Sequence, residues 1–478
     1  MSDTALWLYH RLPSSARSVA ASLRGYYLRW WRYGAETDRL IAEALERDHW
    51  TATQWDLWRE ERLAYVLHRA ATHVPYYREH WRARRRRGDH ASRDILTNWP
   101  PLDKEALRTL PEAFLADDCP RSRLRQVHTS GTTGSPITIW RTRETERALY
   151  ALAAARRRRW YGISHRDPCA LLGGQLVTPA SQQRPPFWVW NAALNQLYMS
   201  SYHLAPAYLP YYLDALARHS ITYLEGYTSS LYALAQEVLQ LGRRDLRLAV
   251  AIPNAEPVYD YQRQAIAAAF QCPVRETYGM AECVAAASEC TGGRLHLWPE
   301  VGCLEVLEGD GRGGGGELLA TGLMNADMPL IRYQIGDRGA LAATSAPCPC
   351  GRSLPILAAV EGRVDDVLYT ADGRRIGRLD PVFKADLPVR EAQIVQDALD
   401  RVRVRYVPTA AFTPDAARCL VDRVQARMGA VAVVLEPVSE VPRTTAGKFR
   451  AVVSNLTAAE RAAIRAVDHA HADLSHRA

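Results

Sequence analysis

Lysine is nearly absent from this chain. Only Lys104, Lys384 and Lys448 stand among its 60 basic residues, and the others are arginines. Arginine therefore supplies positive charge wherever any cation will serve. Because a compact ammonium and a planar guanidinium bind ligands differently, the lysine kept in the segment PRTTAGK, Lys448, is predicted to have a specific role.

Long apolar runs are also missing. No stretch reaches 18 apolar residues, so no transmembrane helix is predicted, and the N-terminal segment lacks the apolar core of a signal peptide. Nine cysteines, an odd number scattered over 478 residues, do not form the pattern of a disulfide framework. These absences predict a cytoplasmic protein.

The net charge of +8 raises the question of an acidic partner. Short arginine runs occur at residues 84–87 and 156–159, but no nucleic-acid-binding signature accompanies them, and we expect no nucleic-acid partner. The segment YYLRWWRY at 26–33 is aromatic and basic. It suits an interfacial helix in peripheral contact with a membrane, but such a stripe more often packs against its own domain.

A glycine- and hydroxyl-rich segment, HTSGTTGSP at 128–136, is the most informative motif. Glycines allow the backbone to approach a ligand closely, and backbone amides with hydroxyls can donate to phosphate oxygens. The segment is not a Walker A loop, because Ser135 stands where that motif has lysine. It predicts a polyphosphate site, with an ordinary surface turn as the alternative. The cradle residues are Thr129, Ser130, Gly131, Thr132, Thr133 and Gly134.

Four further segments follow in order: ETYGMAE at 276–282, RYQIGDRG at 332–339, GRVDD at 362–366 and PRTTAGKFR at 442–450. Together with the phosphate loop, they resemble the core motifs of the adenylate-forming superfamily of acyl-CoA synthetases and related ligases. Within it the chain is most similar to the phenylacetate–CoA ligase-like branch, which includes proteins of capsular polysaccharide biosynthesis. The supporting segments are HVPYYREHW, IPNAEP and CPCGR.

The resemblance implies an α/β fold. A large N-terminal adenylate-forming domain would contain layered α/β subdomains and a small β-subdomain, and a small, mobile α+β domain would follow. From about residue 120, β-branched runs alternate with helical patterns, as such a fold requires. We expect an N-terminal helical region over 1–95, an adenylation core over 96–361 with the β-subdomain at about 295–360, and the C-terminal domain over 362–478. In that last domain we expect a hairpin at 367–377, then helix, strand, helix and strand.

The same resemblance assigns nucleotide contacts. Tyr278, followed by Gly279, would stack on the adenine of ATP, and Asp337 would bind the ribose hydroxyls. Arg363 would contact the nucleotide from the domain junction. A loop preceding a helix would line the adenine pocket. Its residues are Asn254, Ala255 and Glu256.

Three catalytic elements complete this assignment. Glu282 would hold Mg²⁺, a cation that prefers hard oxygen ligands. Asp365 would be the hinge, and Lys448 would bridge the attacking carboxylate and the α-phosphate after domain closure. The chain departs from the family at Ser135, where lysine is frequent, and at Ala281, where threonine is frequent.

A structural zinc site is a further hypothesis. Cys290 and His296 lie close in sequence, and Cys348 and Cys350 supply two more soft ligands, a Cys₃His set. The Cys-x-Cys step is tighter than usual spacings, and buried thiols without metal are the alternative.

These residues predict an ATP-dependent, AMP-forming carboxylate ligase. Coenzyme A is the default acceptor by resemblance. The DG hairpin after residue 366 is longer than the loop that usually lines the pantetheine channel, which keeps an amine or a carrier protein open. Aromatic and polar stretches at 188–191, 202–203 and 227–230 predict an aryl or polar acid. Two alternatives remain: a nucleotide-binding protein without ligase activity, and a membrane-peripheral assembly protein of surface-polysaccharide synthesis that uses the N-terminal aromatic segment as its contact. The oligomeric state is not predicted.

Overall fold

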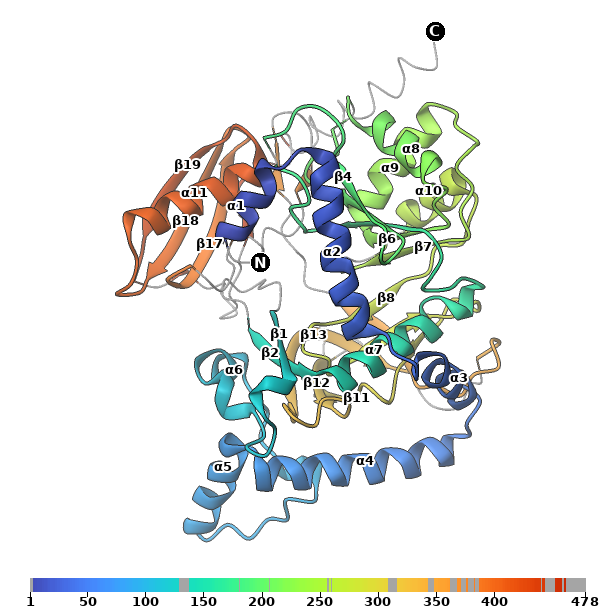
Figure 1. Ribbon diagram of the computed structural model, residues 1–478. Helices are drawn as coiled ribbons and strands as arrows, with labels where there is room; N and C mark the ends of the chain where they lie inside the picture. The colour runs from blue at the N-terminus through green and yellow to red at the C-terminus, as the bar shows by residue number, and fades with distance from the viewer. Residues whose placement is uncertain are drawn as a thin grey trace.

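The chain has a mixed α/β architecture with a separate C-terminal domain, which confirms the predicted fold class (Figure 1). The computed structural model describes residues 3–128, 137–307, 316–342, 348–361 and 387–439, apart from 180, 206, 256, 257 and 259. It also describes 368–370, 375–376, 382, 441–442, 452–457 and 460. Within these ranges, no helix has the length and hydrophobicity needed to cross a bilayer.

Helices make up the N-terminal part of the chain. They are α1 (Asp3–Arg11), α2 (Ser14–Arg32), α3 (Thr37–Arg47), α4 (Ala52–His73) and α5 (Pro75–Arg86). A capping box begins α4, in which the Thr51 hydroxyl accepts from the backbone N–H of Gln54 at 3.2 Å. Pro75 cannot continue that helix but fits the first turn of the next one, so α4 ends and α5 starts there.

Short elements lead from these helices to the core. They are α6 (Lys104–Thr109), the strands β1 (Leu124–His128) and β2 (Thr138–Thr142), α7 (Arg143–Arg156) and four 3₁₀ turns at Leu96–Asn98, Pro111–Phe114, Arg121–Arg123 and Arg159–Tyr161. The strands β1 and β2 pair antiparallel, with His128 opposite Thr138. The ends of the segment that carries the predicted phosphate loop are therefore adjacent.

A five-stranded sheet has the order β4-β5-β3-β6-β7. Its strands are parallel except β4, which is antiparallel to β5 at one edge. The helices α8, α9 and α10 cover one face (Figure 1). The bounds are β3 (Cys169–Gly173), β4 (Trp188–Asn191), β5 (Gln196–Ser200), α8 (Leu209–Arg218), β6 (Tyr223–Tyr227), α9 (Thr228–Gln240), β7 (Val250–Asn254) and α10 (Asp260–Phe270).

A seven-stranded antiparallel sheet follows, in the order β11-β12-β13-β14-β10-β9-β8. Its strands are β8 (Thr277–Gly279), β9 (Ala286–Glu289), β10 (Leu295–Leu297), β11 (Gly302–Leu307), β12 (Gly316–Gly322), β13 (Tyr333–Leu341) and β14 (Ile356–Glu361). The segment after β8 crosses closely over β11. A Cβ at Gly302 would lie 2.0 Å from the carbonyl oxygen of Val284, so only glycine permits this approach.

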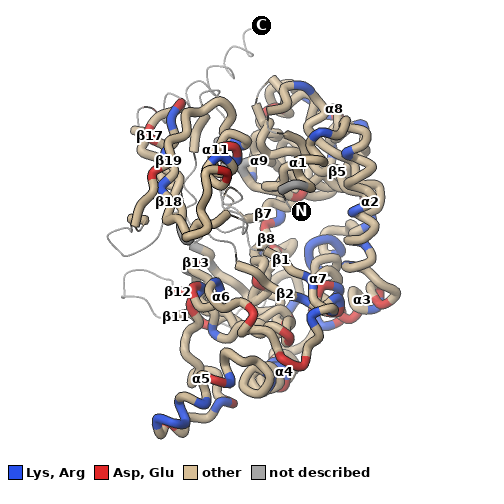
Figure 2. The backbone as a smooth tube through the Cα atoms, turned by 60° about the vertical axis from the view of Figure 1, so that its left-hand side comes forward, with Lys and Arg blue, Asp and Glu red and all other residues tan. Residues whose placement is uncertain are grey.

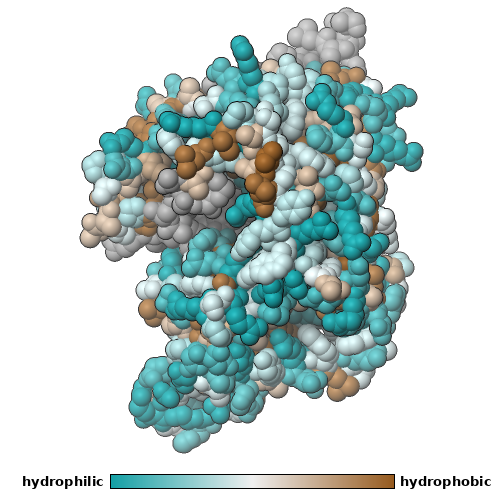
Figure 3. Space-filling model, viewed as in Figure 1, coloured by the Kyte–Doolittle hydropathy of each residue, from teal (hydrophilic) through white to brown (hydrophobic). Residues whose placement is uncertain are grey.

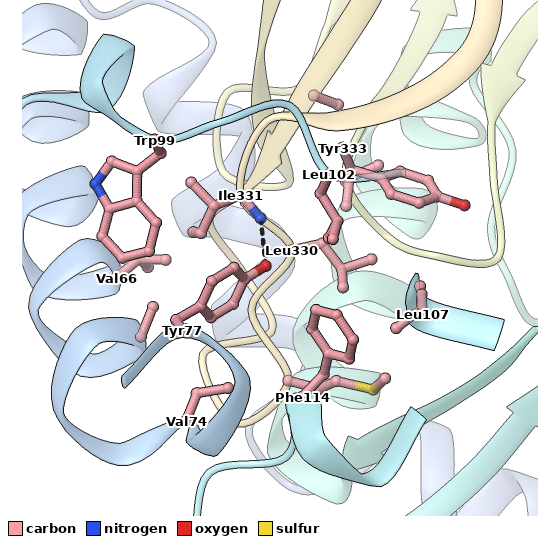
Figure 4. Close-up of a cluster of buried hydrophobic side chains, with 14 of the residues drawn as sticks. Val66, Val74, Tyr77, Trp99, Leu102, Leu107, Phe114, Leu330, Ile331 and Tyr333 are labelled. Atoms are coloured by element: carbon pink, nitrogen blue, oxygen red, sulfur yellow. Dashed lines mark hydrogen bonds between the residues drawn. The ribbon is translucent and has the colours of Figure 1, made fainter. Parts of the chain in front are cut away.

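One buried cluster joins α4 and α5 to this sheet (Figure 4). The Tyr77 hydroxyl accepts from the backbone N–H of Ile331 at 3.1 Å and donates to the carbonyl of Pro329 at 3.2 Å. Tyr333 lies at the edge of the cluster with its hydroxyl pointing away from it (Figure 4). The core thus fixes Tyr333, the first residue of β13, and the hydroxyl of Tyr333 extends out of the core (Figure 4).

The C-terminal domain contains a four-stranded sheet in the order β19-β18-β17-β20. Its elements are β15 (Leu368–Tyr369), β16 (Arg375–Ile376), β17 (Val389–Ala398), β18 (Arg401–Pro408), α11 (Pro414–Met428), β19 (Ala432–Pro437) and β20 (Val452–Ser454). The expected hairpin, the strand at β18, the helix and the last strand are present. The helix expected before β18 is wrong over 389–398, where β17 pairs antiparallel with β18 and buries Ile394 between its neighbours.

Candidate active site

Two sheets meet at the carboxyl ends of β6 and β7. Asn254 ends β7, opposite Tyr227 at the end of β6. The hydroxyl of Thr277, on β8, donates to the carbonyl of Pro253 at 3.2 Å and ties the second sheet to this edge. Ala255 has a φ of 64°, a left-handed conformation that is unfavourable for alanine and is found mainly where a site requires it. Parallel sheets bind ligands at such carboxyl edges.

Tyr278 and Asp337 lie in contact. The Tyr278 hydroxyl donates to Oδ2 of Asp337 at 2.9 Å, although 59 residues and three intervening strands separate them. The seven-stranded sheet must curve for β8 and β13 to meet in this way. The two residues predicted to bind the adenine and the ribose of one nucleotide therefore belong to one polar cluster, with Gly279 beside them on β8.

Glu282 lies in the turn after β8. Its Oε1 accepts from the Tyr333 hydroxyl at 2.9 Å, and Cys283, directly after it, has a φ of 58°. Tyr333 and Asp337 are both on β13. This strand therefore carries the predicted ribose ligand, Asp337, and through Tyr333 also positions the predicted magnesium ligand, Glu282. Lys104 donates to the carbonyl of Ile335 on the same strand.

Arg141 connects this turn to the phosphate-loop hairpin. Its guanidinium donates to the carbonyl of Ala281, immediately before Glu282, and it forms an ion pair with Glu146 at 3.5 Å. Arg141 lies on β2, a few residues after the predicted loop. The carboxylate predicted to hold Mg²⁺ is therefore fixed to the strand that follows the predicted phosphate cradle.

Several predicted residues lie outside the described part of the chain. They are Thr129, Ser130, Gly131, Thr132, Thr133, Gly134, Glu256, Arg363, Asp365 and Lys448. The described residues that the structure brings together are Asn254, Ala255, Tyr278, Gly279, Glu282 and Asp337.

Sequence reasoning missed three residues of this cluster: Tyr333, Lys104 and Arg141. A signal existed for Tyr333, because it stands in the same motif as Asp337, four residues before it. It also misjudged the stretch at 188–191. This is β4, at the edge of the five-stranded sheet opposite β7, whereas Tyr227 is adjacent to Asn254.

Glu276, at the start of the same motif, carries a testable pH dependence. Burial, followed by the nearby Glu289, raises its pKa from 4.5 to about 7 against the lowering effect of Arg263. The folded state therefore prefers the protonated acid, and stability is lost as pH rises from about 4.5 to 7.

We expect Glu276→Gln, which cannot ionise, to stabilise the protein at pH 8 and to have a smaller effect at pH 5. A third of the side chain is exposed, so solvent screening limits the gain to about 1–2 kcal/mol. Thermal unfolding of both proteins at the two pH values measures it. An equal difference at both pH values would contradict the assignment.

A second cluster gathers the four predicted zinc ligands. Cys290, His296, Cys348 and Cys350 place their ligand atoms within 4.8 Å of one another. The Sγ atoms of Cys290 and Cys348 are 3.6 Å apart, and Sγ of Cys350 is 3.4 Å from Nε2 of His296. Tetrahedral zinc with Zn–S bonds of about 2.3 Å holds its ligands about 3.8 Å apart, so the arrangement fits.

The surroundings of His296 suit a ligand role. Its Nδ1 lies 3.0 Å from the carbonyl of Leu354, which orients the ring and leaves Nε2 facing the thiols. Burial lowers the pKa of His296, which favours the neutral imidazole that metals require. The cluster joins the β9–β10 connection to the segment before β14. In the sheet, β14, β10 and β9 lie between β13, which carries Asp337, and β8, which carries Tyr278.

Several known proteins are similar to this chain. Residues 368–455 match the family described as the CapK C-terminal domain. The chain is 26% identical to Protein CapK of Staphylococcus aureus over 75% of this chain and 80% of that protein. It is 26% identical to the phenylacetate-coenzyme A ligase of Aromatoleum evansii over 64% of this chain and 70% of that one.

Among solved structures, a 2-hydroxyisobutyryl-CoA ligase in complex with 2-HIB-AMP and CoA superposes with a TM-score of 0.53. It is 20% identical, over 88% of this chain and 94% of that chain. At this identity the likeness establishes the fold, which is that of the adenylate-forming ligases. Through the CapK C-terminal match and these relatives, the chain is similar to proteins of the phenylacetate–CoA ligase-like branch of the adenylate-forming superfamily.

Proposed function

We propose that this protein is an ATP-dependent, AMP-forming ligase that activates a carboxylic acid and transfers the acyl group to a thiol, that of coenzyme A. The observation that carries the proposal is the contact between Tyr278 and Asp337 beside Glu282. A nucleotide-binding scaffold without ligase activity would have no need for the carboxylate at Glu282 or for a lysine in PRTTAGK.

In the first step, a carboxylate oxygen of the acid bonds to the α-phosphorus and pyrophosphate leaves, giving the acyl-adenylate. Tyr278 would stack on the adenine, and Asp337 would accept from the ribose hydroxyls through charge-assisted hydrogen bonds. Magnesium, held by Glu282 and the substrate phosphates, would neutralise charge on the departing pyrophosphate. Thr129 and its neighbours in the loop would donate to the phosphate oxygens.

In the second step, the thiolate attacks the acyl carbonyl and AMP leaves. Asp365 would act as the hinge that moves the C-terminal domain between the two steps. Aromatic and polar groups near Tyr227, adjacent to Asn254, favour an aryl or polar acid.

An amine is the second candidate acceptor, and the result would be an amide. The hairpin of β15 and β16, in which Leu368 pairs with Ile376, favours it, because this hairpin is long for a loop lining a pantetheine channel. Trapping the intermediate with hydroxylamine tests activation regardless of the acceptor, since an acyl-adenylate yields a hydroxamate. Mass spectrometry of reactions with coenzyme A or with amines then separates the two acceptors. The proposal would be contradicted if no acid in a broad panel gave a hydroxamate in an ATP-dependent reaction.

Asp337→Ala should weaken nucleotide binding about 10–100-fold, because it removes a charged hydrogen-bond acceptor worth about 1.5–3 kcal/mol. Isothermal titration with ATP measures the change. Asp327→Ala is the control, since Asp327 instead pairs with Arg69 on α4 at 2.7 Å. Equal affinity in Asp337→Ala and wild type would remove Asp337 from the ribose site.

We also propose that the Cys₃His cluster binds one structural zinc ion. Zinc at this position would join two segments of the sheet without taking part in the reaction. Purified protein should contain about one zinc per chain by elemental analysis, and Cys350→Ser should reduce the content several-fold and lower the melting temperature. Cys419→Ser, which changes a cysteine outside the cluster, should retain the metal. The zinc site would be contradicted if wild-type protein were purified without zinc and bound none when zinc was added.

A further inference from the structure

Large apolar side chains are exposed along α1 and α2. We call this set the N-terminal apolar face, and its members are Trp7, Leu8, Leu12, Val19, Leu23, Tyr26, Tyr27 and Trp30. Leu23 is 66% exposed and Trp30 is 52% exposed. Hydrophobic atoms gather over α1 and the first half of α2 in Figure 3, with paler residues along the second half. An exposed apolar patch of this extent marks an interaction site.

The helix α2 packs on its own domain through small residues and through Leu28 and Trp31, and its other large apolar side chains face outward. The Ser18 hydroxyl accepts from the backbone N–H of Trp190 at 3.2 Å, and the Ser22 hydroxyl accepts from that of Ala192 at 3.1 Å. A Cβ at Gly25 would lie 2.1 Å from Oδ1 of Asn191. A helix that packs only on its domain buries its large apolar side chains, so the orientation of α2 leaves this stripe for another surface.

The charges on α2 are all positive. The helix α2 contains no acidic residue, and Arg24 and Arg29 are exposed on it. In Figure 2 basic positions are marked in blue along the tube of α2. Two more arginines lie against the exposed tryptophans. The guanidinium of Arg11 is 3.7 Å from the ring centroid of Trp7, and that of Arg143 is 4.5 Å from the ring centroid of Trp30.

We infer that the N-terminal apolar face binds the surface of an anionic lipid bilayer. Tryptophan and tyrosine beside arginine form the composition that suits the boundary between headgroups and acyl chains. At about 1.5 Å per residue, the exposed stripe of α2 from Val19 to Trp30 is about 17 Å long, and it can lie along a bilayer surface. A second copy of the chain is a poorer occupant, because two such faces would bring arginines against arginines. The inference does not depend on the proposed ligase activity.

Flotation of the full-length protein with vesicles tests the inference. We expect it to bind vesicles of phosphatidylcholine with phosphatidylglycerol and not vesicles of phosphatidylcholine alone. The double variant L23E/Y27E should bind at least about tenfold more weakly, because two apolar side chains no longer enter the bilayer. The variant R24Q/R29Q should lose about fivefold in binding for each arginine.

The matched control is L57E/Y65E, which changes the same residue types at exposed positions of α4. It should bind as wild type does, and circular dichroism should show that all variants are folded. The inference is overturned if wild type does not float with anionic vesicles, or if the control lowers binding as much as L23E/Y27E. A dimer interface would also overturn it. In that case sedimentation velocity would show a wild-type dimer that dissociates in L23E/Y27E, and neither wild type nor L23E/Y27E would bind vesicles.

Discussion

Lys448→Ala should lower carboxylate-dependent ATP–pyrophosphate exchange by about 10²–10³-fold, the usual loss when one preorganised group that stabilises transition-state charge is removed. Two anions, the carboxylate and the α-phosphate, must meet in this step. An ammonium between them offsets their repulsion when the C-terminal domain closes. Since PRTTAGK retains one of only three lysines in the chain, we expect no neighbouring side chain to replace it.

The scarcity of lysine provides clean controls for this prediction. Lys384→Ala removes the other lysine of the C-terminal region and should leave exchange within about twofold of wild type. Lys448→Arg keeps the charge but not the compact ammonium, and should recover only a small part of the rate. ATP affinity should change little in Lys448→Ala. An exchange rate for Lys448→Ala equal to that of wild type would exclude this lysine from adenylation.

Arg156→Met should destabilise the protein by about 3–5 kcal/mol, because it removes the fully buried cation between two buried carboxylates. The substitution leaves Glu300 with Arg47 and Asp48 with the more distant Arg352. Arg156 is fully buried at the end of α7. Its Nε donates to Asp48 at 2.8 Å, and its two Nη atoms donate to Glu300 at 2.6 and 3.0 Å. Trp160 donates to the second oxygen of Asp48 at 2.6 Å, so helix, turn and sheet depend on one guanidinium.

Chemical denaturation of Arg156→Met and of Arg39→Met measures the difference. Arg39 pairs with Glu43 on the exposed surface of α3, and such i,i+4 pairs contribute about 0.3–0.5 kcal/mol. Adding Glu300→Gln to Arg156→Met should recover part of the loss, since one uncompensated charge is then removed. A loss below about 1 kcal/mol in Arg156→Met would show that water reaches this network.

The arginine run at 156–159 illustrates the limit of sequence reasoning. The sequence alone does not show which acidic residues pair with this run. In the structure Arg156 binds Asp48 and Glu300, and Arg158 donates to Glu225 at 3.1 Å. These partners come from distant elements that only the fold brings together. Local patterns predicted the N-terminal helical region and the alternation of strands and helices after residue 120, because hydrophobic periodicity is a local property. The strand β17 was missed because its pairing with β18 decides its conformation.

The candidate site shows the same division. Motifs identified Tyr278, Glu282, Asp337 and the four Cys₃His residues, and the structure brings them into two clusters. Resemblance could point to these positions because each sits in a recognisable segment. Arg141 could not be found this way, because its contact with the carbonyl of Ala281 depends on the crossing of two segments.

The most direct test of the central claim is exchange of labelled pyrophosphate into ATP over a panel of aryl, hydroxy and amino-sugar-linked acids. The reaction reports the reversible formation of an acyl-adenylate and needs no knowledge of the acceptor. We predict exchange that depends on one class of acid and on magnesium, and that is lost in Lys448→Ala. ATP binding without exchange for any acid, with Glu282 and Lys448 intact, would contradict the assignment of this protein as a carboxylate ligase.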